Sequence, residues 1–326
     1  MTMLESANAA RHGRLRFHDH LSHQQSFAEA VVWGFSQPQK AIPCRFLYDA
    51  RGSALFDKIC ALPEYYPTRT ETAILRAHAA HMARLIGPSA SLIELGSGSS
   101  VKTRILLDAL ERPACYAPID VSRQHLKQAA ASIAADYPTL RVDAICADYS
   151  EDFPLPACGA RQVAFFPGST LGNLTRADAL SLLRDWRTRL GRDGLMVLGL
   201  DLKKDRATLE AAYDDRAGVT RAFIFNILLR ANRELSADFD LDAFRYEAYY
   251  EPEQGRVEMY LASRAAQTIT LADKRFQLAA GERIHVEHSH KYSLEEARAL
   301  GEAAGFEPLA RYQDAHALFS VHVWQA

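Results

Sequence analysis

Short apolar runs alternate with amphipathic stretches of helical period from about residue 91 onward. The runs are typical of buried strands, and the stretches are typical of helices that cover a sheet. The predicted strands are Ser91–Leu95, Cys115–Asp120, Arg141–Ala147, Gln162–Pro167 and Gly194–Leu200, and the predicted helices are Val101–Leu110, Arg123–Asp136 and Arg176–Leu190. Strands separated by helices predict a parallel sheet with right-handed crossovers.

The alternation stops near Lys203, and a segment of different character follows up to about residue 291. It begins with two helical stretches, Asp205–Tyr213 and Thr220–Leu235, and continues as strands divided by turn residues. The strands expected there are Phe244–Glu251, Arg256–Ser263, Gln267–Leu271, Phe276–Leu278 and Arg283–His288.

The α/β pattern resumes with a predicted helix at Ser293–Ala304 and strands at Phe306–Tyr312 and Leu318–Trp324. The link between the two last strands is short, so they are expected to pair antiparallel. We therefore predict one α/β sheet interrupted by an insertion of about 90 residues.

Residues 21–85 are predicted to be helices and loops. The expected helices are Ser26–Phe35, Ala54–Ala61 and Thr70–Ile86. Pro63 and Pro67 bracket Tyr65 and Tyr66 and are expected to keep that segment out of a helix. Residues 1–20 are polar and are expected to be a frayed lead-in.

Composition and charge exclude several classes of protein. The formal net charge of −2 creates no basic field, so nucleic acid is not an expected partner. No apolar run reaches the roughly 18–20 residues that cross a bilayer, and the N-terminus lacks the apolar core of a secretory signal. The five cysteines are odd in number and form no C-x-x-C pair, so we expect reduced thiols. A cytoplasmic monomer without a membrane partner is the expectation.

A glycine turn stands between the first predicted strand and its helix, in the sequence SLIELGSGSSVKT (91–103). Strand, glycine turn and helix bring backbone N–H groups close to a ligand at the carboxyl end of a strand. The dinucleotide fingerprint G-x-G-x-x-G is incomplete here, because Val101 occupies the place of the third glycine. The turn therefore favours a ligand without a pyrophosphate.

Acids follow the next two predicted strands at the same edge of the sheet. Asp120 ends the second strand and is placed to accept hydrogen bonds from ribose hydroxyls. Asp148 follows the third strand, and Tyr149 beside it could flank an adenine. Each acid alone would more often be a helix cap or a turn residue. Together with the glycine turn they indicate an adenosyl site, and S-adenosylmethionine fits that description.

The chain resembles the histidine-specific, S-adenosylmethionine-dependent N-methyltransferases of ergothioneine biosynthesis, which form trimethylhistidine (hercynine). The resemblance covers roughly residues 25–326 and implies a Rossmann-like class I methyltransferase sheet with an inserted α+β substrate-binding domain. It rests on the linked motifs YDARGSALF (48–56), LPEYYPTRTE (62–71), ELGSGSSVKT (94–103), FFPGSTLGN (165–173), AYDDRAGVT (212–220), RVEMYL (256–261) and VEHSHKY (286–292).

The resemblance implies two domains. Residues 20–69 and 204–291 would form the substrate-binding domain, residues 70–203 and 292–326 the domain that binds S-adenosylmethionine, and residues 1–19 a flexible N-terminus.

The resemblance also implies the residues that hold the methyl donor. Family members hold it with the glycine turn, a lysine shortly after the turn, and acids after strands two and three. The matching residues are Gly96, Lys102, Asp120 and Asp148, with Tyr149 beside the last.

The substrate L-histidine is expected to be met by a second set of residues. The resemblance implies that Asn173 and Tyr213 meet the amine and carboxylate, and that Tyr48 and Tyr65 line the same pocket. Asn173 could equally cap the helix that follows Leu174.

The imidazole ring is expected to be recognised by Glu287 and Ser289, with Met259 nearby, as the resemblance implies. On a strand, residues two apart share a face, so Glu287 and Ser289 point the same way and His288 points opposite. A carboxylate and a hydroxyl suit the N–H and the bare nitrogen of a neutral imidazole. Without the resemblance, Glu287 would be read as a solvated residue. His285, His288 and His290 are not expected to bind a metal, which the reaction does not need.

Methyl transfer from a sulfonium to an amine is an in-line displacement, so the enzyme must align the reacting atoms. An α-amino group titrates near pH 8, so a dedicated general base is not required. Tyr48, Asn173 and Tyr213 are expected to orient the amine, and tyrosine faces tolerate a quaternary nitrogen.

Two alternatives have different consequences. A family member that acts on another amino acid, such as a tryptophan derivative, would be expected to lack the glutamate that stands here at Glu287. The second alternative is a nucleotide-binding or dehydrogenase domain, or a ligand sensor without turnover. The absent third glycine and the presence of the acceptor-side residues speak against it.

Overall fold

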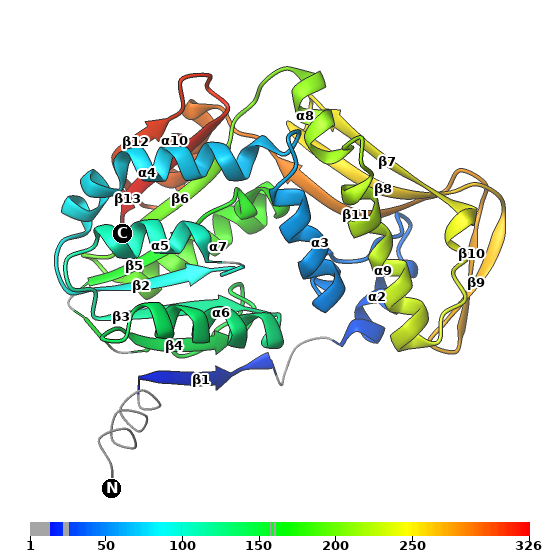
Figure 1. The fold of residues 1–326 in the computed structure, drawn as a ribbon. Helices are drawn as coiled ribbons and strands as arrows, with labels where there is room; N and C mark the ends of the chain where they lie inside the picture. Colours follow the sequence, from blue (N-terminus) through cyan, green and yellow to red (C-terminus); the bar gives the residue numbers. More distant parts are fainter. Residues whose placement is uncertain (1–13, 22–25, 99, 157, 160) are drawn as a thin grey trace, which may run out of the picture. The chain divides into compact units, whose positions relative to one another are not determined.

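The computed structural model describes residues 14–21, 26–98, 100–156, 158–159 and 161–326, and the chain divides into two compact units. The first unit comprises Met1–His23, Pro67–Leu202 and Tyr292–Ala326. The second comprises Gln24–Tyr66 and Lys203–Lys291. Each unit is therefore built from segments that are far apart in the sequence (Figure 1).

The first unit contains an eight-stranded sheet in the order β1-β4-β3-β2-β5-β6-β13-β12 (Figure 1). The strands are β1 (Leu15–Asp19), β2 (Ala90–Leu95), β3 (Cys115–Asp120), β4 (Arg141–Cys146), β5 (Arg161–Phe166), β6 (Leu195–Asp201), β12 (Glu307–Gln313) and β13 (Phe319–Gln325). Strands β1 to β6 are parallel, whereas β13 pairs antiparallel with both β6 and β12. The predicted Rossmann-like sheet with an antiparallel C-terminal pair is confirmed.

Two apolar layers cover the faces of this sheet. Successive residues of a strand point to opposite faces, and in β2 Leu92 belongs to one buried cluster and Ile93 to the other. The first layer comes from α4 (Tyr66–Ile86), α5 (Val101–Ala109) and α6 (Arg123–Asp136), and the second from α7 (Arg176–Leu190) and α10 (Leu294–Ala303). Because both faces are covered, all six residues of β2 are buried, which explains its nearly uniform apolar sequence.

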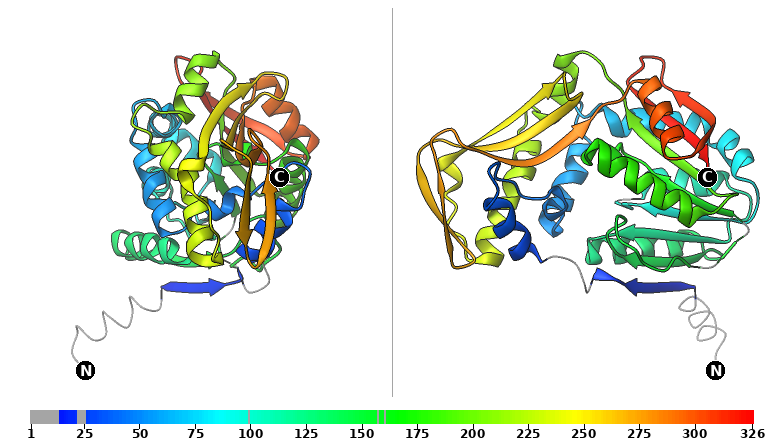
Figure 2. Two further views of the ribbon diagram at one scale, coloured as in Figure 1. Left: turned by 90° about the vertical axis from the view of Figure 1, so that its right-hand side faces the viewer. Right: turned by 180° about the vertical axis from the view of Figure 1, so that it is seen from behind.

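The second unit is an α+β arrangement with antiparallel strands (Figure 2). A three-stranded sheet has the order β11-β8-β7, and β9 and β10 form a separate hairpin. The elements are α2 (Phe27–Phe35), η2 (Cys44–Leu47), α3 (Ala50–Cys60), α8 (Arg206–Tyr213), α9 (Val219–Leu235), η4 (Leu241–Ala243), β7 (Phe244–Glu251), β8 (Arg256–Ser263), β9 (Gln267–Leu271), β10 (Lys274–Leu278) and β11 (Arg283–His290). Helix α3 packs on α9, and α8 packs on β7.

The N-terminal segment differs from the prediction of a flexible lead-in. Residues 1–13 lie outside the described residues, but Leu15–Asp19 form β1, which pairs parallel with β4 at the edge of the sheet. Leu15 and Phe17 pack against the first apolar layer. Leu15 and Phe17 alternate with polar residues, which is the pattern of a strand. The stretch was not predicted as a strand because the residues around it are mostly polar.

The segment around Tyr66 also differs from the prediction. Helix α4 begins at Tyr66 and includes Pro67 in its first turn, where the sequence was expected to stay out of a helix. Proline is tolerated there because the first N–H groups of a helix have no intrahelical acceptor.

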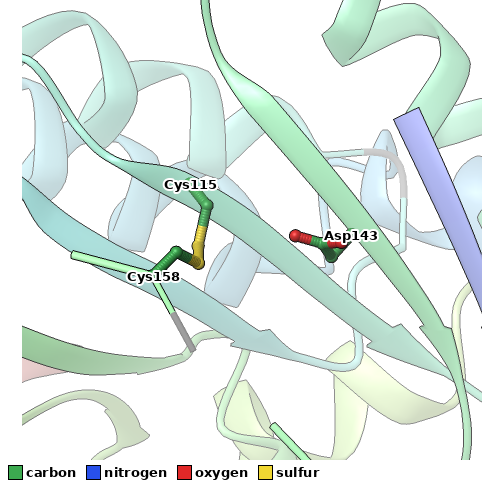
Figure 3. Close-up of side chains that lie close together, drawn as sticks. All are labelled: Cys115, Asp143 and Cys158. Carbon is green, nitrogen blue, oxygen red and sulfur yellow. A yellow bond between two sulfur atoms is a disulfide. The ribbon is translucent and has the colours of Figure 1, made fainter. Parts of the chain in front are cut away.

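The expectation of reduced thiols is wrong for two of the cysteines. Cys115, the first residue of β3, forms a disulfide with Cys158 in the loop before β5 (Figure 3). The two residues are 43 positions apart, and the sheet order brings them together with only β2 between their strands. The carboxylate of Asp143 lies near both sulfur atoms, but sulfurs bonded to each other cannot act as thiolate ligands of a metal.

Among the described residues, every helix is too short or too polar to cross a bilayer.

Candidate active-site residues in the two units

The glycine turn of the first unit is folded against the end of the neighbouring strand. Gly96 and Gly98 adopt φ values of +77° and +44°, which favour glycine. The backbone N–H groups of Gly96 and Ser97 both donate to the carbonyl of Ile119, over 2.9 and 3.2 Å. A Cβ atom at Gly96 or Gly98 would meet no described atom within 4 Å, so this side of the turn is open to a ligand. Ser99 lies outside the described residues.

Asp120 lies directly beside this turn, at the end of β3. Its Oδ2 atom accepts from the N–H of Gly98 over 3.4 Å, and its Oδ1 atom accepts from the N–H of Ser122 over 2.8 Å. Burial raises the pKa of the Asp120 carboxyl, and the hydrogen bonds from Ser122 and Gly98 oppose that rise. The structure thus brings together the turn and the first of the predicted acids.

Asp148 and Tyr149 follow β4, the next strand of the sheet. The Oδ1 atom of Asp148 accepts from the backbone N–H and the hydroxyl of Ser150, over 3.0 and 2.6 Å, which is the geometry of a turn residue. The Tyr149 ring meets Phe166 edge to face at a centroid distance of 5.2 Å. Both residues lie at the carboxyl edge of the sheet, as predicted.

Lys102 is paired with an acid that the sequence did not single out. Its ammonium forms an ion pair with the Oε2 atom of Glu71, and the same oxygen accepts from the N–H of Gly168 over 2.8 Å. Glu71 is completely buried. One carboxylate therefore joins α4, the start of α5 and the loop after β5.

The other carboxylate oxygen of Glu71 occupies space that a glycine provides. A Cβ atom built at Gly199 in β6 would lie 2.1 Å from Oε1. The sequence signal was present, because Glu71 shares a helix face with Ile74 and Leu75, which are both buried. An acid on an apolar helix face indicates a buried charge with a partner.

A second buried acid lies one residue before the end of β2. Glu94 accepts from Thr103 Oγ1 over 2.5 Å and from the hydroxyl of Tyr116. Burial raises the pKa of Glu94 to about 8. These hydrogen bonds join β2, β3 and α5, and so they hold together the elements on both sides of the glycine turn.

Asn173 ends the short helix η3 (Thr170–Asn173) after β5. It does not cap α7, because the N-cap residue is Thr175, whose hydroxyl accepts from the N–H of Asp178 over 3.1 Å. The capping alternative for Asn173 is therefore wrong. The Ser169 hydroxyl accepts from the N–H of Asp201 over 2.9 Å, which ties this loop to the end of β6.

In the second unit, Tyr213 and Ser289 meet a buried lysine. The Tyr213 hydroxyl donates to Ser289 Oγ over 2.9 Å. The ammonium of Lys291 donates to both oxygens, over 2.6 Å to Tyr213 and 2.8 Å to Ser289. Helix α8 ends at Tyr213, Ser289 lies near the end of β11, and Lys291 directly follows that strand. Lys291 was not among the predicted residues.

Glu287 lies on β11 two residues before Ser289 and pairs in register with Met259 of β8. All three side chains are buried. Burial raises the pKa of Glu287 to about 8, and the charge of Lys291 opposes that rise. Glu287 is therefore not the solvated residue that its type alone would suggest.

The histidines of β11 are arranged differently from simple alternation. A register shift lies between His285 and Glu287, and the rings of His285 and His288 stack with centroids 5.5 Å apart. The irregularity accounts for this, because residues three apart would otherwise point to opposite faces. Burial lowers the pKa of His285 to about 4.

The tyrosines of the second unit join through aromatic contacts. Tyr48 packs edge to face on Phe56, and Phe56 packs on Tyr65, with centroid distances of 5.6 and 6.4 Å. Tyr65 in turn meets Tyr213 at 6.1 Å. The chain of contacts from Tyr48 to Tyr213 continues through hydrogen bonds to Ser289, so the predicted tyrosines and the predicted ring-binding strand lie together.

Comparison with known proteins adds an independent finding. A family model described as histidine-specific methyltransferase, SAM-dependent, matches residues 27–326. The histidine N-alpha-methyltransferase of Mycolicibacterium smegmatis is 47% identical over 271 residues, covering 80% of this chain and 83% of that protein. The histidine N-alpha-methyltransferase of Mycobacterium tuberculosis is 38% identical over 289 residues, covering 87% of this chain and 90% of that protein.

A longer relative matches over part of its length. Ergothioneine biosynthesis protein 1 of Neurospora crassa is 32% identical over 283 residues, which are 84% of this chain and 32% of that protein. With the family model covering almost the whole chain, the protein belongs to the S-adenosylmethionine-dependent, histidine-specific methyltransferases.

Proposed function

We propose that the protein transfers methyl groups from S-adenosylmethionine to the α-amino group of L-histidine, three times in succession, and so forms hercynine for ergothioneine biosynthesis. The names of the three relatives support the substrate and the pathway. The observation that carries the proposal is the buried pair Glu287 and Ser289, which share a strand face beside Tyr213.

S-adenosylmethionine supplies the methyl group as an electrophilic sulfonium. The residues of the first unit fit this molecule: the turn at Gly96 and Gly98 has an open side, and the hydroxyl of Ser97 is buried without a hydrogen-bond partner among the described residues. We assign Asp120 to the ribose hydroxyls, and Asp148 with Tyr149 to the adenine.

Lys102 is assigned to the carboxylate of the methyl donor. An ammonium on a flexible stem needs to be held in one position before it can contribute to orientation. Glu71 does this, because its carboxylate pairs with the ammonium and is itself held by Gly168 N–H. We therefore regard Glu71 as a positioning residue for the donor side.

The second unit is assigned to the amino acid. A neutral imidazole has one N–H and one bare nitrogen. The Glu287 carboxyl is the acceptor for the N–H, and the Ser289 hydroxyl is the donor for the bare nitrogen. Met259 pairs with Glu287 in the sheet and is assigned to pack against the ring.

The amine is assigned to Tyr48 and Tyr213, with Tyr65 beside them. These rings provide oxygens that accept from an ammonium and faces that attract a cation without demanding a hydrogen bond. That combination suits a nitrogen that loses its N–H groups one after another. An α-amino group titrates near pH 8, so its proton can leave to water. The role of Asn173 toward the amino acid stays a prediction.

We further propose that the enzyme acts as a monomer in the cytoplasm, with L-histidine as its substrate.

One assay tests the proposal. The protein is incubated with S-adenosylmethionine and histidine, tryptophan or tyrosine, and products are measured by mass spectrometry. Mass increases of one to three methyl groups on histidine alone are expected. Methylation of tryptophan in preference to histidine would point to the alternative substrate. Thermal stabilisation by NAD and not by S-adenosylhomocysteine would overturn the assignment of the methyl donor.

A further inference from the structure

Lys291 has no role in the function described so far, although it is a completely buried lysine. Its ammonium donates to the hydroxyls of Tyr213 and Ser289 and lies 4.5 Å from the centroid of the Tyr213 ring. A buried ammonium is costly unless its N–H groups are bonded. These contacts offset that cost and place the charge beside the strand assigned to the substrate ring.

The ammonium fixes the direction of the two hydrogen bonds that it makes. Lysine has donors and no acceptor, so both hydroxyl oxygens must accept from it. The Tyr213 hydroxyl then donates to Ser289 Oγ. Ser289 Oγ thus accepts from Tyr213 and from Lys291, which uses both of its lone pairs. Its own hydrogen remains as a donor.

We propose that Lys291 is a specificity-determining positioning residue, which makes the Ser289 hydroxyl an obligate donor and so selects substrates whose side-chain ring carries a bare nitrogen. This inference rests on the proposed function. Without the ammonium, Ser289 Oγ would still accept from Tyr213 but would keep its second lone pair, so it could accept from the ring as well as donate to it. A hydroxyl that can turn either way discriminates poorly, because it satisfies a donor and an acceptor equally well.

The inference also gives the two ring-binding residues, Glu287 and Ser289, different hydrogen-bonding roles. Glu287 accepts the ring N–H, whereas Ser289 can only donate to the other nitrogen. A neutral imidazole in one orientation satisfies both groups. A ring without a bare nitrogen would leave the donor of Ser289 buried and unpaired, which a binding site disfavours strongly.

The test uses three histidine analogues whose dissociation constants are measured by calorimetry with S-adenosylhomocysteine present. 3-(Thiazol-4-yl)alanine and 3-(thiazol-5-yl)alanine keep a bare ring nitrogen and carry sulfur in place of the N–H. 3-(2-Thienyl)alanine has neither nitrogen. We divide the affinity of the tighter thiazole isomer by the affinity of the thienyl compound. This ratio measures how much the bare ring nitrogen contributes to binding.

We expect the native protein to prefer the thiazole compound, and Lys291→Met to lower that ratio by about tenfold. Lys291→Gln should lower it as well, because a neutral carboxamide can accept the Ser289 hydrogen. The exposed residue of the same unit, Lys274, provides the matched control, and Lys274→Met should leave the ratio unchanged. A native ratio near one, or an unchanged ratio in Lys291→Met, would overturn the inference.

Folding of each variant is checked by its binding of S-adenosylhomocysteine. If neither Lys291 variant folds, Ser289→Ala removes the same donor and should abolish the preference; a preference that persists there refutes the inference. Failure of the proposed function is recognised separately, because the native protein would then form no methylated histidine, whatever the analogue affinities.

Discussion

The two units each contain a buried glutamate with a lysine nearby, and the two pairs are built differently. In the first unit the ammonium of Lys102 pairs directly with Glu71, whose carboxylate also accepts from Gly168 N–H. In the second unit the ammonium of Lys291 also donates to the hydroxyls of Tyr213 and Ser289, and its charge lowers the pKa of the Glu287 carboxyl.

This difference matches the two kinds of ligand. A direct ion pair holds the ammonium in one position, which suits the proposed contact with the carboxylate of the methyl donor. In the second unit the lysine that donates to two hydroxyls lies near a carboxyl whose pKa burial raises to about 8, and the carboxyl oxygens are the proposed acceptors for the N–H of a ring. The first arrangement is a rigid support, and the second is a set of hydrogen bonds with defined directions.

The largest effect is expected from Glu287→Ala. The variant loses the proposed acceptor for the ring N–H, so the Michaelis constant for histidine should rise about 100-fold. Binding of S-adenosylhomocysteine should be unchanged, because the residues that we propose to bind the methyl donor lie in the first unit. Steady-state kinetics and calorimetry measure the two quantities. Unchanged histidine kinetics would remove the imidazole assignment.

Glu71→Gln should show that the first pair is structural. Removing one partner of a buried ion pair leaves an uncompensated charge on Lys102, so the free energy of unfolding should fall by about 2 kcal/mol. Urea denaturation measures this change. The exposed Glu111 serves as the control, and Glu111→Gln should alter stability by less than about 0.5 kcal/mol. Equal stability in the two variants would contradict the role of Glu71.

Asp120→Ala should affect the donor side alone. Loss of the acceptor for the ribose hydroxyls is expected to weaken S-adenosylhomocysteine binding about tenfold. Histidine recognition by the Glu287 strand should not change. Normal donor affinity in this variant, measured by calorimetry, would count against the ribose assignment.

The smallest effect concerns pH. Because burial raises the pKa of Glu287 from 4.5 to about 8, the folded protein binds more protons than the unfolded chain between those values. Its contribution to stability is therefore full below about pH 4.5 and is lost as the pH rises towards 8.

Comparing native protein with Glu287→Gln isolates this term, since the amide does not titrate. Glu94, whose pKa is also raised to about 8, contributes equally to both proteins. We expect the variant to gain on the order of 1 kcal/mol relative to the native protein between pH 6 and pH 8. Urea denaturation at the two pH values gives the difference, and a constant difference would mean that Glu287 titrates normally.

Local patterns were sufficient for most of the fold. Apolar runs and helical periods predicted the strands β2 to β6 and the helices α5 to α7 closely, because these elements bury continuous surfaces in one sheet. The turn at Gly96 followed from the residue types, since few other residues adopt its backbone geometry. Glu287 and Ser289 were placed on one strand face by spacing alone.

Other features depend on contacts between distant segments, which no local pattern contains. The disulfide between Cys115 and Cys158 exists because the sheet order brings two segments 43 residues apart into contact. The partner of Lys102 lies on a different helix, and the space for that partner is provided by Gly199 on a third element.

The sequence by itself determined which groups are available to bind a methyl donor and an imidazole ring. Only the tertiary structure decided the direction of the hydrogen bonds that Ser289 makes, because that direction depends on Tyr213 from α8 and on the buried ammonium of Lys291. Residue type states that a hydroxyl can donate or accept. Which of the two it does is set by the neighbours that the fold assembles around it.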